Sequence, residues 1–313
     1  MSRSSPISQP SRSNGPPTTW PHRALYDRVI DALHALPARF RTKLRIAGVA
    51  ATDLFTLNTP LGAAIEQSVV DNLNELRSIW DPSDNYQGYV FVRQPQAFPD
   101  VRLQTNAPGA AEPILMGIEL KGWFILSKEG EPSFRYAATP AVCQPQDLLV
   151  VFPWQLDEVI SGSPQLLRPL IDEARFAAEH RNYYWTVSRK VRAGTQRGGV
   201  KLATHSQPYP AKSDRYNDEP ERDSGGNFGR VARGGFMSSF VEDLMESRLS
   251  GIQAKHWLAF LKAFVDGATD AAVGRALETI KSAVAGEVDS DDAALRAVSA
   301  LTDLISERVK IQD

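Results

Sequence analysis

Three side chains in this 313-residue chain have types and a spacing that could do chemistry on a phosphate: Asp100, Glu119 and Lys121. Side chains on a strand alternate between its two faces, so Glu119 and Lys121 would point the same way, with Leu120 on the opposite face. If strand pairing brings Asp100 opposite, two carboxylates and one ammonium converge at one place.

The flanking residues predict that these side chains stand on a β-hairpin. Apolar runs at 89–92, 114–116 and 124–126 are rich in β-branched and aromatic residues, which is typical of strands. Pro108-Gly109 lies between them and is a turn signal. We therefore expect Asp100 on the first strand, a loop over residues 104–113, and Glu119 with Lys121 on the second strand.

Two carboxylates, water and a phosphate oxygen suit Mg²⁺, which takes few protein ligands and keeps several waters. Asp100 and Glu119 are the expected ligands, and the backbone carbonyl of Leu120 is a further candidate. Lys121 would lie beside the water that the metal acidifies, an arrangement for metal-assisted attack on a phosphodiester. An exposed hairpin edge, in which charged and apolar residues alternate for solubility, has the same local pattern and remains the alternative.

The order Pro-Asp, then about twenty residues, then Glu-x-Lys resembles the PD-(D/E)XK nuclease superfamily, and within it the type II restriction endonucleases. The resemblance covers residues 54–154, about a third of the chain. It implies an α/β fold with a mixed central β-sheet flanked by helices. It also implies Mg²⁺-dependent double-strand cleavage of DNA at a specific sequence. A homodimer would match a palindromic target, and a cognate DNA methyltransferase would belong to the same restriction–modification system.

In the resembled family, a helix before the first motif strand commonly supplies an acidic residue to the metal site or its surroundings. A helix from Asn58 to Trp80 is predicted here, because a cap candidate precedes Pro60 and apolar residues recur at helical spacing. Glu66 fits that catalytic position and Glu75 is the other candidate. A plain exposed residue on this helix would look the same in the sequence.

A basic segment follows the predicted core. Residues 181–205 contain six Lys or Arg and no Asp or Glu, with aromatic residues at the start and glycines in the middle. This composition suits a surface that binds the DNA backbone, although an ordinary basic loop is the competing interpretation. The expected phosphate contacts are Arg189, Lys190, Arg192, Arg197 and Lys201.

Residues 209–235 form a long polar stretch that is rich in glycine and nearly free of aliphatic residues. Loops of this length are usually functional or disordered, and both can hold in one protein. Its side chains are of the types that contact base edges in the major groove. The expected DNA contacts are Lys212, Arg215, Arg222, Asn227, Arg230 and Arg233.

Composition and periodicity divide the chain into four parts. Residues 1–19 are low-complexity and predicted to be a disordered tail. Residues 20–180 form the nuclease core with N-terminal helices, beginning with a helix over 20–47. Residues 181–235 form the DNA-contact segment, and 236–313 form a helical region packed on the core. Within the core we further expect a strand at 134–138, a strand at 147–154 that Pro153 closes, and a helix at 166–184.

Overall composition is that of an ordinary globular protein, with 42% hydrophobic and 23% charged residues and a net charge of −2. A single cysteine, Cys143, excludes a disulfide framework within one chain and fits a reducing, cytoplasmic and bacterial setting. No run of eighteen apolar residues is present, so no membrane span is expected.

Two other functions are compatible with the sequence. One is a repair or recombination nuclease on the same core; such relatives often carry Gln-x-x-x-Tyr on the helix after the sheet. Here Gln165 is followed four residues later by Pro169. The other is a DNA-binding protein without activity, against which the complete Asp, Glu and Lys set argues.

Overall fold

The computed structural model describes residues 8–47, 58–159, 161–190, 198–223 and 225–263, together with 269–271, 273–275, 278, 281 and 282. Two predicted phosphate contacts, Arg192 and Arg197, therefore lie outside the described residues, as do residues 1–7 and most of the helical region predicted after residue 263. The described chain is α/β, with a mixed central sheet and several helices, as the sequence predicted.

The helices are α1 (Arg23–Arg39), α2 (Asn58–Glu75), α3 (Arg77–Trp80), α4 (Ala174–Tyr183), α5 (Ser238–Glu246) and α6 (Ala254–Ala263), with short turns η2 (Pro140–Val142), η3 (Tyr184–Ser188) and η4 (Val231–Gly234). The strands are β1 (Val90–Arg93), β2 (Val101–Gln104), β3 (Ile114–Phe124), β4 (Leu148–Leu156), β5 (Pro164–Leu166), β6 (Leu170–Glu173), β7 (Val200–Lys201), β8 (Glu219–Pro220), β9 (Arg248–Leu249) and β10 (Ile252–Gln253).

Six strands form the central sheet in the order β1-β2-β3-β4-β5, and β6 also pairs with β4. Strands β1, β2 and β3 are antiparallel, whereas β3 and β4 run parallel, with Leu120 opposite Val150. Strands β3 and β4 are almost continuously buried, as expected of central strands that are covered on both faces. The predicted hairpin is therefore present, and its second strand is the middle of the sheet.

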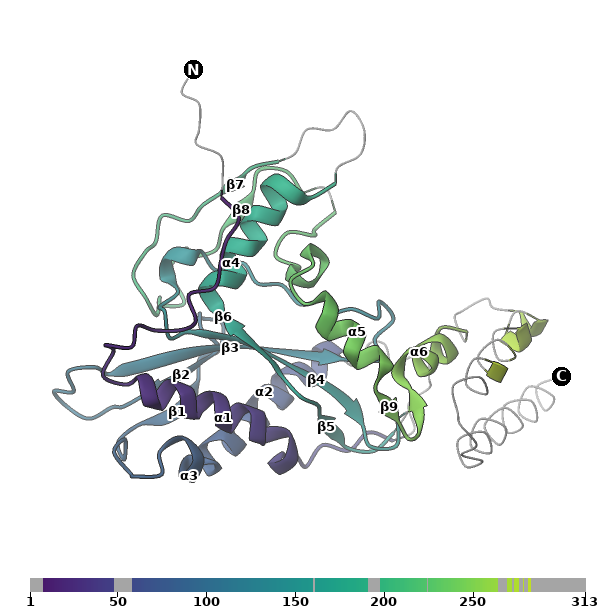
Figure 1. Ribbon diagram of the computed structural model, residues 1–313, viewed down its shortest axis with the longest axis horizontal. Coiled ribbons are helices and arrows are strands. Elements are labelled where there is room, and N and C mark those ends of the chain that lie inside the picture. Colours follow the sequence, from purple (N-terminus) through teal and green to yellow (C-terminus); the bar gives the residue numbers. More distant parts are fainter. Residues whose placement is uncertain are drawn as a thin grey trace, which may run out of the picture.

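Helices cover both faces of this sheet. Figure 1 shows α1, α2 and α3 on the lower side and α4 on the upper side, with α5 and α6 beyond the end of the sheet. Helix α2 turns Ile65, Val69 and Leu73 inward at helical spacing, and all three are buried. Within the described residues, no helix combines the length and the apolar character needed to cross a bilayer.

Residues 134–138, predicted to be a strand, have only an isolated bridge between Ala138 and Asn217. Their backbone groups find other partners. The N–H of Tyr136 donates to the Gly229 carbonyl at 2.8 Å, and the guanidinium of Arg181 donates to the carbonyls of Tyr136 and Ala138 at 2.9 and 3.0 Å. At Tyr136 and Ala138, the Arg181 side chain thus donates the hydrogen bonds that a neighbouring strand would otherwise supply.

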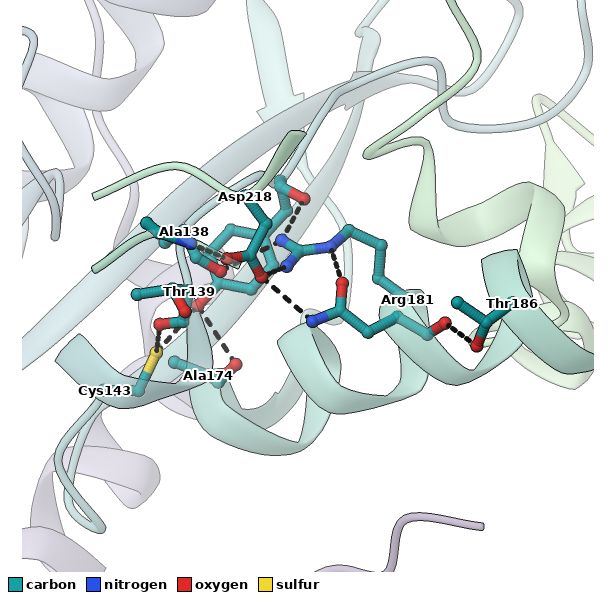
Figure 2. Close-up of polar contacts among 10 residues, drawn as sticks. Ala138, Thr139, Cys143, Ala174, Arg181, Thr186 and Asp218 are labelled. Atoms are coloured by element: carbon teal, nitrogen blue, oxygen red, sulfur yellow. Dashed lines mark hydrogen bonds and ion pairs between the residues drawn. The ribbon is translucent and has the colours of Figure 1, made fainter. Parts of the chain in front are cut away.

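Arg181 opens the predicted basic segment, but it is buried and cannot meet a phosphate. Figure 2 shows its guanidinium directed at Asp218, with a separation of 2.5 Å and side-chain exposures of only 2% and 0%. Asn182 also donates to Asp218 at 2.9 Å, and the N–H of Ala203 donates to its other oxygen at 2.9 Å. This pair joins α4 to two segments that follow it in the chain.

The helix predicted over 166–184 begins only at Ala174. Residues 164–166 and 170–173 are instead strands that pair with β4 on its second edge. The apolar β4 needs a partner on that edge, and Pro169 keeps the chain from starting a helix earlier. Pro153 does not close β4, because it lies where β4 changes partner from β6 to β5.

Three further expectations are corrected. Helix α1 ends at Arg39 rather than near residue 47. The predicted tail contacts β6 through residues 12–15: Arg12 pairs with Asp172 at 2.6 Å, and the N–H groups of Ser13 and Gly15 donate to Glu173. The C-terminal region is not purely helical, because the β9–β10 hairpin separates α5 from α6.

The buried Arg181–Asp218 pair gives a stability prediction. Replacing Arg181 by Met leaves the Asp218 carboxylate buried without its cation, which should lower the free energy of unfolding by about 3–5 kcal/mol in a urea titration. Arg45→Met is the control, because Arg45 and Glu158 form an exposed pair at 3.4 Å and exposed pairs contribute about 0–1 kcal/mol. Equal losses in the two variants would contradict the assignment.

Candidate active site

The register of β2 and β3 brings Asp100, Glu119 and Lys121 together. Val101 lies opposite Ile118, so Asp100, one residue earlier, lies beside Glu119. The Lys121 ammonium Nζ is 2.9 Å from Asp100 Oδ2 and 2.6 Å from Glu119 Oε1. The three predicted residues therefore form one cluster, with one ammonium between two carboxylates.

Backbone groups fix the two carboxylates as well. The N–H of Leu120 donates to Asp100 Oδ2 at 3.0 Å, and the N–H of Asp100 lies 3.3 Å from Glu119 Oε2. In an extended strand, the N–H and C=O of one residue point to the same neighbour. The Leu120 carbonyl, the further candidate ligand, therefore lies on the edge of β3 that faces Asp100.

The cluster is largely shielded from solvent, with side-chain exposures of 24% for Asp100, 11% for Glu119 and 15% for Lys121. Burial and the neighbouring Asp100 carboxylate raise the pKa of Glu119, and the contacts with Lys121 oppose that rise. Burial alone would lower the pKa of Lys121, but Glu119 and Asp100 outweigh it and raise that pKa. Lys121 is thus held as a cation and is no proton acceptor at neutral pH.

A pocket of about 240 Å³ opens beside the two carboxylates. Asp100 and Glu119 are part of its lining, and residues from three other segments, 96–98, 135–138 and 216–217, complete it. The complete lining is Gln96, Ala97, Phe98, Asp100, Glu119, Arg135, Ala137, Ala138, Tyr216 and Asn217. Two of these segments, 135–138 and 216–217, are the ones that the buried Arg181–Asp218 pair joins.

The donor set fits a hard divalent cation. Asp100 and Glu119 supply carboxylate oxygens at the pocket, and the Leu120 carbonyl lies on the same edge of the strand. Among the described residues, no group of three or more Asp, Glu, His or Cys side chains could hold a metal ion. A cation here would thus take two carboxylates and complete its shell with water and substrate oxygens, which Mg²⁺ accepts.

Glu66 lies near this cluster without joining it. Its carboxylate pairs with Arg93 at 3.1 Å, and both side chains are partly buried. Burial and the nearby Asp100 raise the pKa of Glu66, while Arg93 and Lys121 oppose the rise. Glu66 on α2 is therefore close enough to Asp100 and Lys121 for their charges to affect its pKa. Its catalytic role stays a prediction.

A close packing arrangement positions Asp100. Pro99 lies directly over Gly117 of β3, where a Cβ would be 2.2 Å from the Pro99 Cγ atom. The N–H of Gly117 donates to the buried Asp147 carboxylate at 2.7 Å, which also accepts from Gln144 at 2.8 Å. Glycine in a strand often marks such a close approach. The absence of a side chain at 117 lets Pro99 place Asp100 beside Glu119.

Three of the five predicted phosphate contacts lie within the described residues, and two of these three are exposed. Lys190 and Lys201 are exposed, and Lys201 lies on the short β7 strand. The Arg189 guanidinium stacks over the Trp185 ring at 3.7 Å from its centroid. Lys190 and Lys201 thus lie at the surface, Arg189 is half-buried, and Arg181 at the start of the segment is buried.

The predicted base contacts fall into two groups. Lys212, Arg215 and Arg222 are exposed. The other three side chains take part in a polar network with the 129–131 segment. It consists of Arg230 with Glu129 at 3.4 Å, Arg233 with Glu129 at 3.2 Å and with Glu131 at 2.8 Å, and Arg233 with the side-chain oxygen of Asn227 at 2.5 Å.

Sequence reasoning missed Arg135, Tyr216 and Asn217, which line the pocket. Only Arg135 carried a visible signal, as a cation between aromatic residues, and it was expected on a strand. Tyr216 and Asn217 reach the pocket through the bridge between Ala138 and Asn217, a pairing that no local pattern predicts.

Comparison with known proteins gives no match: no family model, curated protein or solved structure matches the chain. The resemblance noted in the sequence therefore rests on Asp100, Glu119 and Lys121 themselves.

The packing around Gly117 can be tested with a matched pair of variants on β3. Gly117→Ala places a methyl group against Pro99 and should lower the free energy of unfolding by about 1–3 kcal/mol, because overpacked sites must shift. Gly122→Ala is the control, since its Cβ would stay 3.6 Å from the nearest atom, an ordinary contact. Chemical denaturation of both variants measures the difference, and equal stabilities would refute the argument.

Proposed function

We propose that this protein is a Mg²⁺-dependent type II restriction endonuclease that cuts both strands of DNA at a specific sequence. The observation that carries the proposal is the convergence of Asp100, Glu119 and Lys121 beside a pocket, at the place where β2 and β3 meet. The exposed cations of the 189–222 region support a polyanionic substrate. A homodimer on a palindromic target and a cognate methyltransferase are part of the same proposal.

The carboxylates and the ammonium of the cluster would have different roles. Asp100 and Glu119 would hold Mg²⁺, which when bound acidifies a water molecule and neutralises charge on the phosphate. Lys121 stays protonated between the carboxylates, so its contribution is electrostatic: it would stabilise negative charge that develops on the phosphate and orient the attacking water. Glu66 on α2 would tune this cluster through the charge of Asp100.

The alternative of a repair or recombination nuclease has less support. Gln165, the residue that could begin a Gln-x-x-x-Tyr signature, lies on β5 rather than on the helix after the sheet. An assay with supercoiled plasmid and Mg²⁺ separates the functions. Discrete bands would indicate cleavage at a specific sequence, a smear unspecific or processive digestion, and intact supercoils binding alone.

The first functional prediction concerns Lys121. Lys121→Ala should slow single-turnover cleavage by a factor on the order of 10², the cost of losing one electrostatic donor. DNA affinity measured with Ca²⁺ in place of Mg²⁺ should change little, because the side chain acts on the developing charge. Lys43→Ala, which removes an exposed lysine that does not line the pocket, is the control and should cut at the normal rate.

Asp100→Ala and Glu119→Ala should both abolish cleavage in the same assay, and excess chelator should do so for the unchanged protein. Full activity in chelator would contradict the metal assignment. A Lys121→Ala variant that cuts as fast as the Lys43→Ala control would contradict the assignment of Lys121 to catalysis.

A second functional prediction separates backbone binding from base recognition. Lys201→Ala should weaken binding to cognate and scrambled duplexes alike and lower the salt slope by about one unit. Arg215→Ala should cost about 1–3 kcal/mol on the cognate duplex only, as for a lost base contact. Titrations of both duplexes across salt, with Ca²⁺ present, measure the two effects. Equal losses of Arg215→Ala on both duplexes would make Arg215 another phosphate contact.

A further inference from the structure

The charge of the pocket raises a problem for an anionic substrate. Asp100 and Glu119 line it, and a phosphodiester that enters meets both carboxylates. The Lys121 ammonium is not among the lining residues, and it already contacts both carboxylates. Among the ten lining residues, Arg135 is the only cation. Among the residues that line the pocket, Arg135 is therefore the side chain that could attract a phosphate.

Arg135 is well placed for this task. It is exposed to solvent, so a substrate can reach it. One of its terminal nitrogens, Nη2, donates to the Gly226 carbonyl at 2.5 Å, and a guanidinium has five N–H donors in a planar fork. That fork matches the geometry of phosphate oxygens. The bond to Gly226 orients the side chain and leaves donors for an anion.

The backbone on which Arg135 stands is fixed from two sides. The N–H of the next residue, Tyr136, donates to the Gly229 carbonyl, and its C=O accepts from the buried Arg181. The 226–229 loop also fits closely around Arg135. A Cβ at Gly226 would be 3.0 Å from its Nη2 atom, and one at Gly229 would be 3.4 Å from its Cβ atom. Arg135 thus belongs to a preorganised wall.

We infer that Arg135 binds a phosphate oxygen of the substrate in this pocket, at or next to the phosphate that is cut. The inference rests on the proposed nuclease function and adds a substrate-binding residue to it. Because Arg135 also bonds to Gly226, the phosphate contact is joined directly to the loop that carries the predicted base contacts.

The experiment compares the unchanged protein with Arg135→Ala and Arg135→Lys. Arg168→Ala is the control, since Arg168 is 63% exposed and pairs with Asp243 rather than lining the pocket. Cleavage is first mapped on plasmid DNA with Mg²⁺. Binding is then measured with Ca²⁺ on two duplexes of the mapped sequence, one natural and one with a single uncharged methylphosphonate at the cut phosphate.

The unchanged protein and the control should prefer the natural duplex. Arg135→Ala should bind the natural duplex about 10- to 100-fold more weakly, the value of one charge-assisted hydrogen bond. It should also lose most of the preference over the methylphosphonate duplex, which a merely structural role would not remove. Arg135→Lys should recover part of the affinity for the natural duplex and part of the preference over the methylphosphonate duplex, because lysine keeps the charge without the planar fork.

Other outcomes are distinct from one another. No plasmid cleavage by the unchanged protein would overturn the proposed function and this inference with it. Cleavage by the unchanged protein, with an Arg135→Ala variant that keeps the full preference for the natural duplex, would overturn the inference alone. If Arg135→Ala binds both duplexes more weakly by the same factor and keeps the preference, Arg135 acts in the packing of the loop. That result would also overturn the inference.

Discussion

The buried ion pair between Arg181 and Asp218 is the interaction on which the geometry of the pocket depends. An ion pair with side-chain exposures of 2% and 0% pays a large desolvation cost, which only a full set of partners offsets. Arg181 has such partners in the carbonyls of Tyr136 and Ala138, and Asp218 accepts from Ala203. The pair therefore fixes two pocket walls that β-sheet pairing does not reach.

Charge balance explains the arrangement of the cluster formed by Asp100, Glu119 and Lys121. Asp100 and Glu119 are held close together by strand register, and one ammonium between them leaves a net negative charge in a largely buried place. Burial makes that charge costly, so a further cation is favoured. Lys121 already contacts both carboxylates and is not among the residues that line the pocket. In the proposed nuclease, a bound cation or another lining residue would attract the anionic substrate, and Lys121 would act on the charge that develops during cleavage.

The alternation of residues along the strands and the hairpin signal were enough to predict the cluster of Asp100, Glu119 and Lys121. Alternation along β3 put Glu119 and Lys121 on one face, and the hairpin put Asp100 beside them. Such patterns could not predict Arg135 as part of the pocket, because residues 134–138 are extended and apolar like a strand. Their true partners are a guanidinium and a loop more than forty residues away in sequence. Likewise the helix predicted before Ala174 was wrong, since β4 required a strand on its second edge.

The same reasoning bears on the predicted DNA contacts that are already paired. Arg230 and Arg233 meet Glu129 and Glu131, but these side chains are 20–42% exposed. Ion pairs of that kind contribute about 0–1 kcal/mol, so exchanging a glutamate for a phosphate or a base edge costs little. Together with the Arg135–Gly226 bond, the pairs connect the 226–233 segment to residues 129–135 and restrict its motion. A loop ordered in advance loses less entropy on binding. The paired arginines are thus compatible with the proposed recognition of DNA.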